Sequence, residues 1–380
     1  MFLIRQSMPD DIGTLLKLAR MVYFINLPPD ERLIAAKVQQ SRHSFQKAAG
    51  GGRTKKPAGR GRTGGITGLA SHDSDVFMFT IVDVDATGGG VVGTSQIRSR
   101  MGGPGNPNYS LKVFQREFRS STLGIGTTHT LARLHADESG PSEVGGLIIQ
   151  PAFRGHRDRP GRLLSFVRFH LVGLFPELFS DRIVAEMAPQ VSSDGDNSFW
   201  DAIGRKFIPV RYAEADRFCQ QNRKFIDELF PKDDIYLTLL PLEVLNQVGQ
   251  VGPETAPARR MLEKIGFEYK QFIDPFDGGP HLEAKIERVA LIRDTRWSEL
   301  GEVIDEAGGS HRLIVSVLGE DGEFRAVECS GQFDKQRRVC VPMRAMELLG
   351  ASRGMKCGVT PLEAIKPTAK KTRRAVAGKA

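Results

Sequence analysis

One loop of the sequence combines residue types that suit the binding of a phosphate group. It follows an expected strand, residues 143–150 (EVGGLIIQ), and precedes an expected apolar helix, residues 162–174. Free backbone amides and the helix dipole at a helix N-terminus favour an anion, and guanidinium groups match phosphate geometry. The residues that supply these features are Arg154, Gly155, Arg157, Arg159, Gly161 and Arg162. A pyrophosphate is the natural ligand, while a solvated basic turn explains the same composition equally well, because two glycines make a weak motif.

The segments around this loop predict an α/β arrangement. Residues 2–4 and 182–187 have the apolar runs of strands, and residues 12–22 repeat apolar side chains at helical spacing. Residues 76–97 contain two β segments separated by a turn rich in Asp, Gly and Thr, so they predict an antiparallel hairpin. A short amphipathic helix, residues 198–206, ends this unit.

A second unit begins near Val210. It contains an expected helix at 213–230, a strand at 235–239 and a helix at 255–265. The sequence Ile-Gly-Phe at the end of that last helix echoes the end of the first unit, which hints at a repeat on two matches only. From residue 297 onward, short β segments and one brief helix predict a small β-barrel-like domain.

A chain of 380 residues is long enough for two or three domains. We expect an N-terminal lobe, a second lobe, a small β-rich domain and a basic tail, over residues 1–209, 210–296, 297–365 and 366–380. The tail and a Gly-rich basic insert, residues 42–75, hold much of the net charge of +8. Both segments are expected to be disordered.

Outside these two segments the chain is close to neutral, which argues against a nucleic-acid partner and favours small-molecule substrates. The four cysteines contain no C-x-x-C pair, so reduced thiols and a cytoplasmic location are expected. No apolar run reaches the roughly 20 residues of a membrane-spanning helix, and no metal-ligand spacing is present. We therefore expect no membrane association and no metal. The sequence leaves open whether the chain forms a homo-oligomer or a hetero-oligomer.

Four segments together resemble the acyl-CoA-binding half of the Gcn5-related N-acyltransferase fold. They read EVGGLIIQPAFRG, GRLLSFVRF, RIVAEM and SFWDAIGRKF, and residues 258–269 resemble the helix and strand that close such a domain. The resemblance implies an α/β fold with two lobes of mixed sheet and flanking helices. It also implies a strand that splays from its neighbour and bonds the pantetheine arm through its backbone, next to a loop that cradles the pyrophosphate.

A narrower resemblance, to arginine N-succinyltransferases, rests on separate segments between Phe2 and about Trp297. Among these segments are Val184 to Met187, Ser198 to Trp200, Thr255 to Arg259, and Phe276 to Pro280. The family transfers a succinyl group from succinyl-CoA to the α-amino group of arginine, in arginine catabolism. The resemblance implies the same reaction here, with succinyl-CoA as cosubstrate and no permanently bound cofactor. It places Leu147, with Ile148 beside it, against succinyl-CoA.

The sequence departs from the family pattern at positions that bear on catalysis. The family has a proton-donor His in a Gln-Val-His-Pro motif, and this chain has Gly252 in that place. A second family His is replaced by Asp233, and the phosphate-suited loop is slightly longer, with Arg159 near the expected glycine. Another group must therefore handle the proton.

Acyl transfer to an amine requires a deprotonated nucleophile and a polarised thioester carbonyl. Glu186 is the first candidate for the base, because burial raises the pKa of a carboxylate; a carboxylate that binds the substrate's amine or guanidinium is an equal alternative. Asp233, Asp234 and Tyr236 form a second candidate cluster, in which Tyr236 donates a proton to the thiolate, although a loop before an ordinary strand explains them somewhat better. His281 is of a kind more typical of structural positions, and Cys219 has no His nearby in sequence.

Other functions stay open on sequence grounds. Loss of the proton-donor His favours a non-catalytic acyl-CoA-binding or subunit-like relative, whereas the retained family segments around Glu186 favour an active enzyme. An acyltransferase with another acyl-CoA or amine substrate is the remaining alternative. For a succinyl group, Arg259 or Arg211 is the expected partner of the distal carboxylate.

Overall fold

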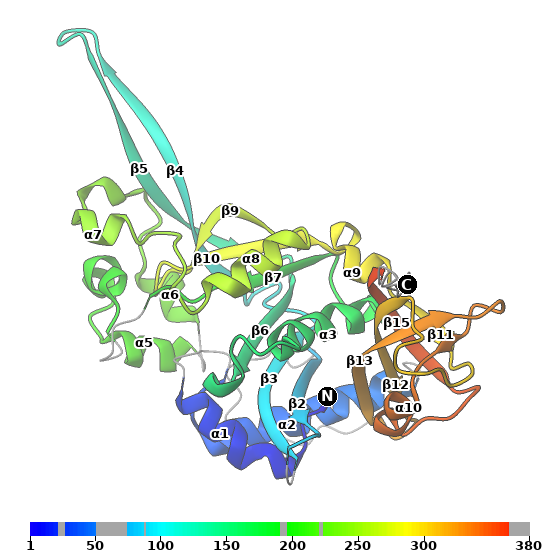
Figure 1. Ribbon diagram of the computed structural model, residues 1–380. Helices are drawn as coiled ribbons and strands as arrows, with labels where there is room; N and C mark the ends of the chain where they lie inside the picture. The colour runs from blue at the N-terminus through cyan, green and yellow to red at the C-terminus, as the bar shows by residue number, and fades with distance from the viewer. Residues whose placement is uncertain (22–26, 51–73, 87–88, 191–195, 220–222, 365–380) are drawn as a thin grey trace, which may run out of the picture.

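The computed structural model describes residues 1–21, 27–50, 74–86, 89–190, 196–219 and 223–364 (Figure 1). Its strands are β1 Phe2–Gln6, β2 Val76–Asp83, β3 Gly90–Arg98, β4 Asn108–Ser120, β5 Ile125–Asp137, β6 Ser142–Ile149, β7 Arg182–Glu186, β8 Ile235–Tyr236, β9 Glu268–Ile273, β10 Pro280–Lys285, β11 Arg296–Glu299, β12 His311–Leu318, β13 Phe324–Phe333, β14 Val339–Cys340 and β15 Lys356–Ala364. Its α-helices are α1 Ile12–Arg20, α2 Glu31–Ala49, α3 Pro160–Leu174, α4 Arg205–Phe207, α5 Tyr212–Cys219, α6 Lys224–Leu229, α7 Leu242–Leu245, α8 Ala256–Lys264, α9 Ala290–Arg293 and α10 Met343–Leu349.

The strands form one continuous mixed sheet, which agrees with the expected α/β class. Its order is β11-β15-β12-β13-β1-β2-β3-β6-β7-β10-β9-β4-β5-β8, and β14 pairs with β13 beside this path. The pairs are antiparallel except β6 with β7, which is parallel. The strands after residue 297 join the sheet through β13 and β1; closure into a barrel stays a prediction.

Strand β2 lies at the centre of the main core, where both α2 and α3 contact it. The rings of Phe77 and Phe79 meet Phe45 of α2 edge-on, with centroids 5.0 and 5.6 Å apart. From α3, Leu164 and Phe169 are fully buried in the same core. Full burial of a side chain of this size contributes roughly 1.5–3 kcal/mol. This core therefore fixes α3, and the loop at its N-terminus, against the sheet.

The expectation of disorder over residues 42–75 is wrong for both ends of that segment. The last part of α2 occupies its beginning, where Phe45 is fully buried on an apolar stripe at helical spacing. The Oγ atom of Ser44 accepts a hydrogen bond of 3.1 Å from the amide of Val76 at the start of β2. The stripe is hard to recognise in the sequence because basic and other polar residues separate its apolar positions. Residues 51–73 lie outside the described residues, as does the expected basic tail.

The second unit also differs from expectation. The expected single helix at 213–230 is two helices, α5 and α6, and the expected strand at 235–239 ends at Tyr236. The expected helix at 198–206 contains a π-helical turn that begins at Trp200. A β-carbon at Gly204 would lie 2.1 Å from the Trp200 ring, so only glycine leaves room for the fully buried indole.

Strands β4 and β5 form a long two-stranded arm that projects from the body (Figure 1). Their register runs from Asn108↔Asp137 at the base to Ser120↔Ile125 at the tip. Strand β9 pairs with the arm near its base, and β8 pairs with it about halfway along. Among the described helices, none is long and apolar enough to cross a membrane.

Candidate active site

The parallel strands β6 and β7 separate soon after they pair. Their register contains Ser142↔Ile183 and Glu143↔Val184. Beyond these pairs β6 bends at Gly146, whose φ of 57° favours glycine, and it continues along β3 with a register shift. A cavity of about 770 Å³ lies where the two strands diverge. The diverging part of β6 therefore faces this cavity instead of a neighbouring strand.

Leu147 and Ile148 line this cavity. The Ile148 side chain is buried in the cluster formed by α1 and α2, whereas Leu147 packs against the main core around α3. Successive side chains of a strand point to opposite faces of its sheet. The strand consequently turns its backbone edge toward the cavity.

The phosphate-suited loop borders the cavity at the N-terminus of α3. Arg154, Gly155 and Gly161 line the cavity, and Arg159 precedes the first helical residue with a left-handed φ of 49°. The Arg157 side chain is 90% exposed and does not line the cavity. The structure thus brings the predicted cofactor-binding residues to one place, with the exception of Arg157.

Arg154 and Arg162, two of the predicted phosphate-binding arginines, differ in how strongly a carboxylate holds each of them. Arg162 lines the cavity, but its Nη2 lies 2.6 Å from Oε1 of Glu328 on β13. Arg154 lies 3.1 Å from Glu254, and both of these side chains are exposed, so the ion pair contributes little. Arg154 can therefore exchange its partner for a phosphate at lower cost than Arg162.

Strand β7 ends at Glu186, whose side chain lines the same cavity. The side chain is 18% exposed, and Oε1 accepts a hydrogen bond of 3.3 Å from Nδ2 of Asn108. Burial raises the pKa of Glu186, and the positive charge of His281 opposes this shift. A carboxyl group with a raised pKa is suited to accept a proton near neutral pH.

His281 lies beside Glu186 because β10 and β7 pair these residues directly. Its Nε2 is 3.8 Å from Glu186 Oε1 and 3.9 Å from Asp274 Oδ2. The other oxygen of Asp274 accepts hydrogen bonds from the amides of Phe276 and Asp277. Burial alone would lower the pKa of His281, but the two carboxylates raise it above its ordinary value. Glu186, Asp274 and His281 offer ligand atoms within 4.8 Å of one another, and the two carboxylates favour the charged form of the imidazole.

Tyr236 and Asp233 do not lie at this cavity. The Tyr236 ring packs against Phe118 and His129 on the β4–β5 arm, and Asp233 is exposed. Their predicted catalytic roles thus gain no support from the structure. Burial raises the pKa of the Cys219 thiol to about 12, which keeps it protonated and disfavours it as a nucleophile.

Gly252 lines the cavity at the position where the family resemblance expects a His. A β-carbon there would lie 2.9 Å from the carbonyl oxygen of Pro189 and 3.2 Å from the nitrogen of Gln190. The Gly252 amide also donates a hydrogen bond of 3.2 Å to the carbonyl of Ala188. Backbone therefore occupies the space that a side chain at this position needs.

Sequence reasoning did not single out Arg168 of α3, and the two arginines that it named for the distal carboxylate lie elsewhere. Neither Arg259 nor Arg211 lines the cavity, and Arg259 pairs with Glu263 at 2.8 Å. Arg168 lines it and is 3% exposed. An arginine inside an otherwise apolar helix was the available signal, since arginine is almost never fully buried without a partner.

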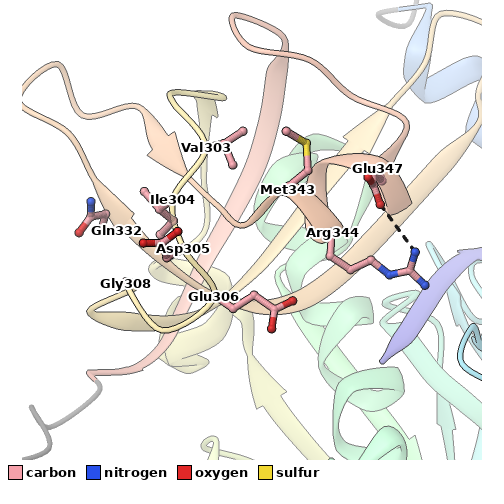
Figure 2. A pocket seen from close by; sticks show the side chains of 9 residues that line it. All are labelled: Val303, Ile304, Asp305, Glu306, Gly308, Gln332, Met343, Arg344 and Glu347. Carbon is pink, nitrogen blue, oxygen red and sulfur yellow. Dashed lines mark ion pairs between the residues drawn. The ribbon is translucent and has the colours of Figure 1, made fainter.

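A second cavity, of about 730 Å³, lies in the C-terminal part of the chain (Figure 2). Figure 2 shows Arg344 of α10 turned toward Glu347, with Nη1 and Oε2 3.6 Å apart. This cavity contains none of the predicted site residues, so the cavity between β6 and β7 is the candidate active site.

The mixed sheet, the anion-suited loop and the buried carboxylate at one cavity define an enzyme of the acyltransferase class. Comparison with known proteins agrees with this. The sequence model described as arginine N-succinyltransferase beta subunit matches residues 62–291. An arginine N-succinyltransferase of Escherichia coli O17:K52:H18 is 32% identical over 305 residues, which cover 80% of this chain and 81% of that protein. One from Shigella dysenteriae serotype 1 has the same identity and coverage.

This chain belongs to the arginine N-succinyltransferase family. A solved structure described as arginine/ornithine succinyltransferase subunit AI from Pseudomonas aeruginosa matches its fold with a TM-score of 0.75 and 24% sequence identity. That match covers 96% of this chain and 99% of the other.

Proposed function

We propose that this chain transfers the succinyl group of succinyl-CoA to the α-amino group of L-arginine, in arginine catabolism. One observation carries the proposal: the anion-suited loop and the buried carboxylate of Glu186 line the same cavity between the splayed strands β6 and β7. A CoA thioester needs a phosphate site at one end and a proton acceptor near the other. Family membership supports the same reaction.

The proposed reaction assigns succinyl-CoA one orientation in the cavity. Its pyrophosphate lies at the N-terminus of α3, where Arg154, Gly155 and the helix dipole favour negative charge. The pantetheine arm follows the backbone of β6 past Leu147, in the manner of the Gcn5-related fold. The thioester then lies toward the point where β6 and β7 part, on the side of Glu186.

The reaction itself needs one proton acceptor. The neutral α-amine attacks the thioester carbonyl, a carbon–nitrogen bond forms, and Glu186 takes the proton that the nitrogen loses. The carbon–sulfur bond then breaks and CoA leaves as a thiolate. Thiols are far more acidic than amines or alcohols, and that of cysteine has a pKa of about 8.5, so the thiolate is a good leaving group and water can protonate it. Chemistry of this kind tolerates Gly252 in place of the family's proton-donor His.

His281 supports this role of Glu186. Its imidazolium lies 3.8 Å from the carboxylate and opposes the rise in pKa that burial causes. Glu186 thereby stays ionised, and able to accept a proton, to lower pH than it otherwise would.

A non-catalytic acyl-CoA-binding relative is the second candidate function, and Gly252 is the observation that favours it. The backbone of Pro189 and Gln190 excludes a His side chain there. An acyltransferase for another acyl-CoA or amine is a further alternative.

The deciding experiment measures thiol release from succinyl-CoA and from acetyl-CoA, with and without L-arginine. We expect arginine-dependent release from succinyl-CoA by the wild-type protein and its loss in Glu186→Gln. Glu243→Gln, a change of the same kind at an exposed site on α7, is the matched control and retains activity. Binding of CoA without thiol release, for any amine tested, would establish the non-catalytic alternative.

Two further proposals concern the setting of the reaction. The family description and the solved structure both name a subunit, which supports assembly of this chain with itself or with a related chain; light scattering of the purified protein tests this. The four cysteines are free thiols, which supports a cytoplasmic location.

A further inference from the structure

Arg168 is a buried cation that lines the candidate active site. It lies on α3, is 3% exposed and lines the cavity. Its guanidinium donates hydrogen bonds to the carbonyl and Oγ of Ser165, at 3.0 and 2.6 Å, and to the carbonyl of Gly145, at 3.5 Å. These three bonds use three of its five N–H groups. Among the described residues, no carboxylate pairs with it.

A buried charge without a counter-ion is unfavourable unless the fold or a ligand compensates it. Burial lowers the pKa of Arg168 to about 9, so the side chain is still a cation at neutral pH. The carbonyl and hydroxyl partners satisfy hydrogen bonds, and the Phe169 ring lies 5.7 Å from the guanidinium carbon, but none of these groups carries a negative charge. A ligand with a negative charge would supply what the site lacks.

The position of Arg168 indicates which part of a ligand it meets. The guanidinium of Arg168 bonds the carbonyl of Gly145, which lies just beyond Glu143↔Val184, the last pair of β6 with β7. Arg168 therefore lies where the two strands begin to separate. It is also eight residues from Pro160 at the start of α3, or roughly 12 Å along the helix axis. The phosphate loop is at that start. A pantetheine arm bound along β6 therefore brings the acyl end of its thioester toward Arg168.

We propose that Arg168 forms a carboxylate-binding subsite that holds the distal carboxylate of the succinyl group and so selects succinyl-CoA over uncharged acyl-CoAs. The inference rests on the proposed function for the orientation of the cosubstrate. The planar guanidinium forms paired hydrogen bonds with a carboxylate. Acetyl-CoA has no group for this subsite and leaves the buried charge uncompensated.

The test compares acyl-CoAs in the wild-type protein and in Arg168→Met. We expect kcat/KM for succinyl-CoA to fall about 10- to 150-fold, the range for a lost hydrogen bond to a charged group, while kcat/KM for acetyl-CoA is retained or rises. Arg168→Lys keeps the charge but loses the paired geometry, and we expect an intermediate loss for succinyl-CoA. If Arg168→Met does not fold, Arg168→Lys provides the test instead.

Arg154→Met is the matched control. Arg154 is placed at the pyrophosphate, which all acyl-CoAs share, so its loss weakens succinyl-CoA and acetyl-CoA equally. An equal loss for both in Arg168→Met would show a merely structural role and overturn the proposal. A loss confined to KM for arginine would instead assign Arg168 to the carboxylate of the amino acid, and would also overturn it.

Calorimetric binding of succinyl-CoA, acetyl-CoA and CoA, without arginine, separates this inference from the proposed reaction. We expect the wild-type protein to prefer succinyl-CoA and Arg168→Met to lose that preference. If this result appears in a protein that transfers nothing to arginine, the subsite stands and the proposed reaction fails. A preference for succinyl-CoA that survives in the variant refutes the subsite directly.

Discussion

Replacement of His281 by Gln tests how Glu186 is kept ionised. The two charges are 3.8 Å apart. At an effective dielectric constant of about 20, opposite charges at this distance attract by roughly 4 kcal/mol. Partial exposure of Glu186 reduces the net attraction between the two charges. A third of that value still changes the protonation equilibrium of Glu186 about tenfold. Removal of the cation raises the pKa of Glu186, so a higher pH is needed to ionise it.

Other charged or titratable groups also face this pair, and they remain in the variant. They are Glu143 on β6, Cys219 on α5, Arg223 before α6, and Asp274 and Asp277 in the turn before β10. Of these, Glu143 and Asp274 raise the pKa of Glu186 and Arg223 lowers it. The carboxylates outnumber the guanidinium, so the remaining field does not replace the lost imidazolium.

The assay is the ratio of kcat/KM in His281→Gln to that in the wild-type protein, from pH 6 to pH 9.5. Titration of arginine's own amine cancels in this ratio. We expect the ratio to be lowest at the acid end of this range, where it falls up to about tenfold below one, and to rise toward one at high pH. A ratio that is low but independent of pH would refute the reasoning, since a packing defect lowers activity at all pH values alike.

Three further outcomes are expected. Gly252→Ala should lower the free energy of unfolding in urea by about 1–3 kcal/mol, because the added methyl group overpacks against Pro189. Gly13→Ala is the control, since open space surrounds Gly13, and it should not lower this free energy. Equal urea midpoints for the two variants would count against the tight contact at Gly252. Burial favours the neutral form of Glu283, but Lys270 and Arg182 lower its pKa overall. Folding stability therefore falls as the pH drops below about 4.5. In thermal melts, Glu283→Gln should show a smaller loss of melting temperature over this pH range. Dialysis against EDTA should leave the rate unchanged, and a loss restored by a divalent cation would establish a metal requirement.

Local patterns predicted much of the fold from the sequence. Strand β2, helix α3 and the hairpin of β2 with β3 follow from apolar runs, helical spacing and turn composition, each within a few consecutive residues. The one brief helix expected after residue 297 is α10. The division of residues 213–230 into two helices was not predictable in the same way, because the apolar spacing continues across the break.

The site was predictable only where its residues lie close in sequence. The loop from Arg154 to Gly161 is one such segment, and it borders the cavity as expected. His281 is far from Glu186 in the chain, and only the pairing of β10 with β7 brings them together. Sequence alone gave no reason to prefer that pairing, so His281 was taken for a structural residue. Tyr236 is the reverse case, since its place near the family's functional positions in sequence does not bring it to the cavity.

The most direct test of the account is arginine-dependent thiol release from succinyl-CoA by the wild-type protein and Glu186→Gln, with CoA binding measured on both. The account predicts release by the wild-type protein, loss of release in the variant, and equal binding of CoA by the two, because Glu186 acts on the amine and not on the nucleotide. Release that persists in Glu186→Gln at the wild-type rate would contradict the assignment of the base.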